Sequence, residues 1–141
     1  MIEIDNRTSL EVDQIFLDNI AKTLTNKEIE LIITTKNEIK KINKDSRNID
    51  KSTDVLSFPY EYMPMAPLGS IVISSWHVET KAKELGHGTN DELALLFIHG
   101  LLHLLKFDHE IDNGQMRNKE AELIKHFNLP KSLIVRTEKG V

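Results

Sequence analysis

Three histidines in one short stretch of the chain have the spacing of metal ligands. His99, His103 and His109 stand in the run His-Gly-Leu-Leu-His-Leu-Leu-Lys-Phe-Asp-His. In a helix, side chains four residues apart lie about 40° apart on one face, so His99 and His103 can converge on one ion. His109 reaches the same ion only if the chain turns after Leu105. Three neutral imidazoles predict an open Zn²⁺ site, one ion per chain, in which water takes the fourth position.

The helix predicted around the first two histidines is apolar on nearly every face. It extends from Asp91 to about Leu105 and is rich in leucine, so it should be buried. Imidazoles buried there without a partner would cost about 1–3 kcal/mol each. A metal ion satisfies both rings, which favours ligation over ordinary packing. Nickel, copper or manganese would fit the same ligands, so the sequence predicts a metal more firmly than its identity.

The histidine spacing matches the metzincin peptidase pattern H-E-x-x-H-x-x-G-x-x-H except at two positions. Gly100 stands where the peptidases have glutamate, and Lys106 stands where they have glycine. Loss of the glutamate removes the base that takes a proton from the attacking water, a contribution of about 10²–10⁴ in rate. The pattern therefore favours another substrate, and a zinc peptidase-like hydrolase is kept as an alternative.

A basic stretch stands out in a chain that is acidic overall. The whole chain has a formal net charge of −4, whereas residues 36–51 hold six basic and three acidic residues. Lys36, Lys40, Lys44 and Arg47 fall within about 80° of one another on a predicted helix. This basic stripe predicts contact with an RNA backbone, and a solvated helix face is the alternative.

Other polar side chains have weaker signals. Asp108, next to a predicted ligand, either orients an imidazole or caps a helix turn. Tyr60 and Tyr62 lie in a proline-rich loop at 59–67, where they either pack the loop or stack on bases. Three further histidines share no ligand spacing with the trio and are expected to be surface or partly packed residues: His77, His87 and His126.

Hydrophobic patterns predict strands and helices along the whole chain. Strands are expected at 2–6, 28–35, 54–58 and 68–74. The first helix should begin at a capping box of Thr8 and Glu11 and bury Val12, Ile15, Phe16 and Ile20. Four more helices are expected: one from the box of Thr35 and Glu38 to roughly Ser46, one near 78–85, one capped by Thr89 and Glu92, and one from about Gly114 to Phe127.

These elements predict a single α+β domain over residues 1–141. It should have a mixed sheet of about four strands, about five helices, and a buried central helix that carries the metal ligands. Residues from about 130 to 141 are expected to be a loosely ordered tail. The absence of cysteine excludes disulfides, thiolate metal sites and a cysteine nucleophile. With no leader segment and no apolar run of about 18 residues, we expect a cytoplasmic protein without a membrane partner.

Two blocks of the sequence resemble the bacterial YbeY endoribonucleases, a family also described as ribosomal RNA maturation factors. The first block is the run from His99 to His109. The second is Arg47 followed by Thr-Asp-Val-Leu-Ser-Phe-Pro at 53–59, with Leu-Gly-Ser-Ile at 68–71 between the blocks. Length and order agree over nearly the whole chain. The resemblance implies zinc ligation by His99, His103 and His109 and an active-site role for Arg47, so we take Arg47 and His99 as the catalytic residues.

The resemblance implies a Zn²⁺-dependent, single-strand-specific endoribonuclease that acts in ribosomal RNA maturation and ribosome quality control. Its expected partners are single-stranded ribosomal RNA and the ribosome or ribosome-associated proteins. A non-catalytic ribosome-associated factor with a structural metal site is a further alternative. Two positions depart from the family pattern: Lys106 replaces a glycine, at a cost of roughly 1 kcal/mol if its backbone is left-handed, and Ser70 replaces an aspartate.

Overall fold

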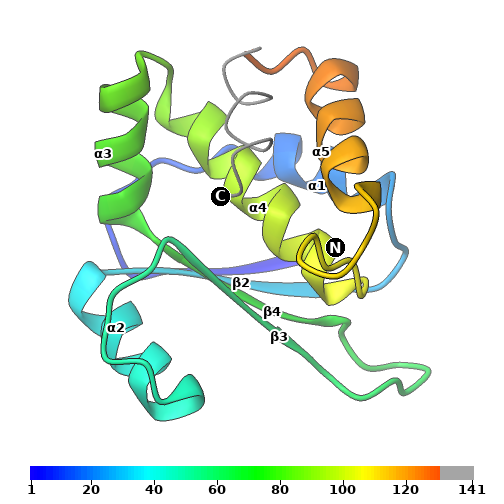
Figure 1. Ribbon diagram of the computed structural model, residues 1–141, viewed down its shortest axis with the longest axis horizontal. Helices are drawn as coiled ribbons and strands as arrows, with labels where there is room; N and C mark the ends of the chain where they lie inside the picture. Colours follow the sequence, from blue (N-terminus) through cyan, green and yellow to red (C-terminus); the bar gives the residue numbers. More distant parts are fainter. Residues whose placement is uncertain (131–141) are drawn as a thin grey trace.

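Four strands form one mixed sheet, with helices on both of its faces (Figure 1). The computed structural model describes residues 1–130. The strand order is β1-β2-β4-β3, which leaves β3 at an edge. The first three of these run parallel, and β3 is antiparallel to β4: β1 (Ile2–Asn6), β2 (Ile29–Thr34), β4 (Gly69–Ser74) and β3 (Val55–Pro59). The predicted α+β fold with a four-stranded mixed sheet is confirmed.

Within residues 1–130, five helices cover the sheet unequally. One helix lies alone on one face, α2 (Lys36–Arg47), and four lie on the other side: α1 (Gln14–Lys22), α3 (Ser75–Leu85), α4 (Thr89–Leu104) and α5 (Gln115–His126) (Figure 1). Side chains alternate along each strand, so each face has its own core. Along β4, Ile71 and Ile73 join the larger core with α4, whereas Val72 packs with Ile39 of α2.

The helix α4 is the predicted central helix, and it is buried on nearly every side. Every residue from Glu92 to Leu102 is buried. A Cβ at Gly100 would lie 2.8 Å from Ile71 Cγ2 and 3.2 Å from Ser57 Oγ. The Ser57 hydroxyl donates a hydrogen bond of 2.9 Å to the Gly100 carbonyl. Gly100 therefore marks a close approach of the helix backbone to the sheet, where a Cβ would force a neighbour to move.

The predicted start of α1 is wrong. The helix begins at Gln14, where the Asp13 carboxylate accepts a hydrogen bond of 3.1 Å from the Phe16 N–H. Thr8 instead bonds Asn6 in a local turn, through both its N–H and its hydroxyl. The helix buries Leu17, Ile20 and Ala21, and Ile15, predicted to be buried, is 76% exposed. Asp13, rather than Thr8, therefore caps the helix.

The predicted cap of α4 is wrong by one residue. The helix begins at Thr89 itself, and the Asp91 carboxylate accepts a hydrogen bond of 3.2 Å from the Gly88 N–H. Glu92 therefore does not complete a capping box. Its side chain is fully buried, with Oε1 2.9 Å from Nε2 of His87. The His87 side chain is 4% exposed, more deeply buried than the sequence predicts.

The other helix boundaries agree with the predictions to within a residue or two, except that α3 begins at Ser75, three residues before the predicted start near 78. Thr35 caps α2 by accepting from the Glu38 N–H, and α2 continues one residue past the predicted end to Arg47. Gly86 ends α3 in a left-handed conformation with φ 72°. The predicted tail at 131–141 lies outside the described residues. Among residues 1–130, no helix has the length and apolar character needed to span a bilayer.

Replacing Gly100 with alanine should lower the stability of the fold. Overpacking a core costs about 1–3 kcal/mol, whereas the gain in helix propensity from glycine to alanine is at most about 1 kcal/mol. We expect thermal unfolding to show a lower Tm, by about 4 °C for each kcal/mol of net cost. The matched control is Asn90→Ala, at an exposed position of the same helix, which should leave Tm nearly unchanged. An unchanged Tm in the Gly100→Ala protein would contradict the close contact.

Candidate metal and nucleic-acid site

The three predicted metal ligands come together in the structure. Their ligand atoms all lie within 4.8 Å of one another. His99 and His103 belong to consecutive turns of α4, and their Nε2 atoms are 3.2 Å apart. The chain turns after Leu105 as the spacing requires, because Lys106 adopts φ 74° and the Phe107 N–H donates to the Leu102 carbonyl. Lys106 thus has the left-handed backbone conformation at the position where the family pattern has glycine.

The donor set fits a bound transition metal. Nδ1 of His109 is buried and has no hydrogen-bond partner within residues 1–130. Burial lowers the pKa of His103, and the neighbouring His99 and His109 lower it further. A neutral ring keeps a nitrogen lone pair available. Three such imidazoles without a carboxylate among them are a typical donor set for Zn²⁺, Cu²⁺ or Ni²⁺.

The buried carboxylate of Glu120 was missed by the sequence analysis. Glu120 lies on α5 and is 2% exposed, with Oε1 3.3 Å from Nδ1 of His99. A carboxylate that accepts the Nδ1 proton leaves Nε2 of the ring free for a metal. One signal could have revealed it: Glu120 falls at helical spacing with the buried Met116 and Ile124, so a charge sits on an apolar face.

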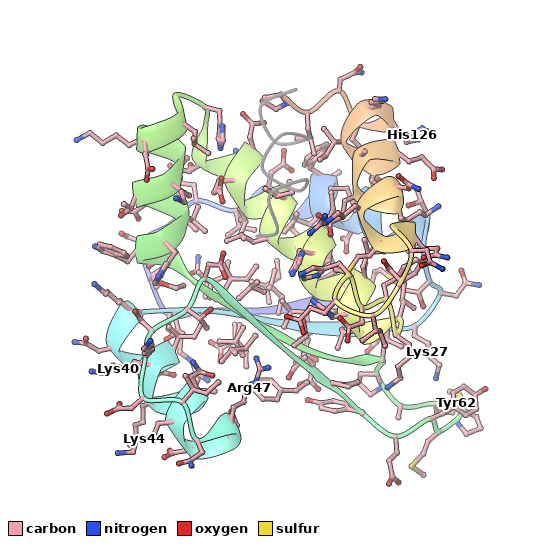
Figure 2. The ribbon with its side chains drawn as sticks, in the orientation of Figure 1. Lys27, Lys40, Lys44, Arg47, Tyr62 and His126 are labelled. Atoms are coloured by element: carbon pink, nitrogen blue, oxygen red, sulfur yellow. The ribbon has the colours of Figure 1, made fainter. Side chains whose placement is uncertain are left out.

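The histidines open into a cleft of about 610 Å³ that follows the edge strand β3. The strand contributes Ser57 and Phe58 to the cleft, and the end of α2 contributes Arg47. Because α2 and α4 lie on opposite faces of the sheet, their side chains can meet only around an edge. Figure 2 shows the Arg47 side chain directed from α2 toward the strands. The structure thus brings the predicted arginine and the predicted ligands into one cleft.

The predicted basic stripe is divided in the structure. Arg47 lines the cleft, whereas Lys40 and Lys44 are exposed and point away from it (Figure 2). The Lys36 ammonium lies 3.9 Å from the centroid of the Trp76 ring. Contact between these lysines and RNA stays a prediction.

Asp108 acts locally as a turn cap. Its Oδ1 accepts a hydrogen bond of 3.0 Å from the Glu110 N–H. It lines the cleft as well, and its charge partly opposes the lowering of the pKa of His103. Of the two roles predicted for Asp108, capping a turn and orienting an imidazole, the hydrogen bond favours the cap.

The remaining candidates lie apart from the histidine trio. Ser70 is buried in β4. The Tyr60 hydroxyl donates to Glu30 at 2.9 Å, while Tyr62 is 80% exposed with the Lys27 ammonium 4.4 Å from its ring centroid. His77 is half-buried and His126 is exposed, as the sequence predicts.

Comparison with known proteins identifies relatives over nearly the whole chain. The sequence model of the family described as Endoribonuclease YbeY matches residues 2–128. Endoribonuclease YbeY of Sulfurimonas denitrificans is 66% identical over 138 residues, which is 98% of this chain and 99% of the relative. The Helicobacter pylori protein of the same name, from strain 26695, is 55% identical over 139 residues, with the same coverage. A solution structure from Thermotoga maritima, 28% identical, superposes with a TM-score of 0.62 over 90% of this chain and 89% of that one.

Replacing Glu120 with alanine should weaken metal binding. Without the carboxylate, Nδ1 of His99 loses its hydrogen-bond partner, and loss of such a partner typically costs about 10–100-fold in metal affinity. Competition between the protein and a chelator for Zn²⁺ measures the change. Glu122→Ala is the matched control, since Glu122 is exposed on the same helix and should leave affinity at the wild-type value. Wild-type affinity in a folded Glu120→Ala protein would rule out the positioning role.

The metal-free protein should lose stability in acid. The pKa of His103 is lower in the folded chain than its usual value of about 6.5, so the unfolded chain binds more protons below that pH. This contribution is fully present above about pH 6.5 and is lost as the pH falls toward the folded pKa. Urea unfolding between pH 8 and pH 5 should show a falling midpoint, and His103→Gln should flatten the dependence. Equal slopes in the two proteins would show that His103 is not responsible.

Proposed function

Because this chain belongs to the YbeY family of endoribonucleases, we propose that it cleaves single-stranded ribosomal RNA with the help of a Zn²⁺ ion held by His99, His103 and His109. Its proposed roles are ribosomal RNA maturation and ribosome quality control in the cytoplasm, with the ribosome or ribosome-associated proteins as partners. The observation that carries the proposal is the shared cleft, in which Arg47 from one face of the sheet lines the same space as three histidines from the other.

The side chains of the cleft have complementary tasks toward a phosphodiester. A Zn²⁺ ion, when bound, polarises a phosphate oxygen or lowers the pKa of a bound water. Arg47 presents a planar fork of donors that matches two phosphate oxygens at once. Its fixed charge offsets the negative charge that develops on those oxygens as the bond breaks. Glu120 orients the His99 ring through the contact between its carboxylate and Nδ1.

The packing of Gly100 argues against the peptidase-like alternative. The position that holds the peptidase glutamate faces the sheet here, where even a Cβ would meet Ile71 at 2.8 Å. A carboxylate side chain at this position would have to displace Ile71. The non-catalytic alternative needs a closed fourth ligand, but within residues 1–130 the group that could hold a metal consists of three histidines. An open coordination position supports catalysis.

The decisive test is turnover of single-stranded RNA by variants of Arg47. Arg47→Ala should lower kcat by roughly 10²–10³, as for other lost charge-stabilising donors, and Arg47→Lys should fail to restore it because lysine offers only a point charge. Zinc content and Tm should stay near wild type, because the residue is exposed. Arg117→Ala, at an exposed position on α5, is the matched control and should leave kcat unchanged.

Metal analysis of the same preparations completes the test. The wild-type protein should contain about one zinc per chain, and the protein with His99, His103 and His109 all replaced by alanine should contain none and cleave no RNA. Full zinc content in that triple variant would exclude this metal site. Wild-type turnover in both Arg47 variants would remove the arginine from the mechanism.

A further inference from the structure

Trp76 lies half-exposed beside a small pocket that the proposed function does not use. It is the one tryptophan of the chain and is 46% exposed at the start of α3. Tryptophan is highly buried on average, so an accessible indole is a notable surface feature. The pocket beside it holds about 220 Å³, and its other walls are Asp54, His77, Thr80, Lys81 and Glu84. This volume suits one planar ring rather than a helix of a partner protein.

The pocket and the cleft share a lining residue. Asp54, the residue before β3, lines both of them. The helix α2 makes a second connection, because its first residue, Lys36, lies over the Trp76 ring and its last, Arg47, lines the cleft. At 1.5 Å per residue, the backbone positions of these two residues are about 16 Å apart along the helix. A strand bound at Arg47 would therefore reach Trp76 a few nucleotides away.

The chemistry around the indole suits a nucleobase. Aromatic side chains stack on bases of any sequence, because every base has a π-face. The Lys36 ammonium lies over one face of the ring, 3.9 Å from its centroid, so a base would stack on the other face. Lys36, together with Lys81, which stands in the pocket wall and pairs with Glu84, supplies positive charge near the ring for the phosphates. The carboxylate of Glu84, with Oε2 3.5 Å from the Lys81 ammonium, can accept a hydrogen bond from the amino group of a base.

We propose that Trp76 and its pocket form a stacking subsite for one base of the single-stranded RNA whose phosphate is held at Arg47. The proposal rests on the proposed function. It adds a point of contact outside the cleft, which would select unpaired strands because a base must leave its helix to stack there.

Tryptophan fluorescence tests this proposal directly, since the signal comes from Trp76 alone. The zinc-loaded full chain is mixed rapidly with a short single-stranded RNA, and binding is read before cleavage. We expect saturable quenching of the fluorescence. An RNA of equal length with abasic sites, and inorganic polyphosphate, should cause little quenching. Trp76→Ala should weaken RNA binding about tenfold or more, and the affinity of Trp76→Phe should lie between those of the wild type and the alanine variant.

Leu85→Ala is the matched control, since Leu85 is an exposed apolar residue on the same helix outside the pocket. It should bind RNA as the wild type does. RNA that is bound and cut without quenching, and with equal affinity in the Trp76→Ala protein, overturns the stacking subsite and leaves the proposed function intact. Equal quenching by polyphosphate also overturns it, because the signal then reports charge near Lys36. A wild-type protein that neither binds nor cuts RNA overturns both.

Discussion

The contact between α4 and the sheet sets the position of the whole site. At Gly100 the helix backbone lies close enough to β3 and β4 that a Cβ would collide with Ile71, and Ser57 bonds the helix there through its hydroxyl. His99 and His103 flank this contact in sequence. Because the core around them is closely packed, any change that lifted the helix from the sheet would displace both rings together. The glycine thus serves the geometry of the ligands although it has no side chain that could bind a metal.

The edge position of β3 explains how two opposite layers contribute to one cleft. In the interior of a sheet, neighbouring strands separate the side chains of the two faces. No strand within the described part of the chain lies beyond β3, so Arg47 of α2 and the three histidines line the same space. An exposed strand edge is usually a hazard for aggregation. In this protein the edge forms the wall of the cleft instead.

Two buried histidine and glutamate pairs tie neighbouring segments to α4. His87 and Glu92 join the loop before the helix to its first turns, at 2.9 Å. His99 and Glu120 join α5 to the metal-binding turns, at 3.3 Å. A buried carboxylate is costly unless it has a partner, so each pair favours one arrangement of the segments it connects. The second pair couples the packing of α5 to the orientation of a metal ligand.

Local patterns were sufficient for the strands, the buried helix and the histidine trio. Strand alternation, helical spacing and a four-residue interval between ligands all depend on residues close in sequence, as does the turn at Lys106 that brings His109 back. The predicted caps of α1 and α4 were wrong because Asp13 and Asp91 make the capping hydrogen bonds instead of the predicted residues. A sequence pattern does not show which of several neighbouring polar residues will cap a helix. Only the tertiary structure decided that Glu120 meets His99 and that Arg47 lines the cleft while Lys36 lies over Trp76. These contacts join residues far apart in the chain, and they exist only because α5 packs on α4 and α2 ends at an open sheet edge.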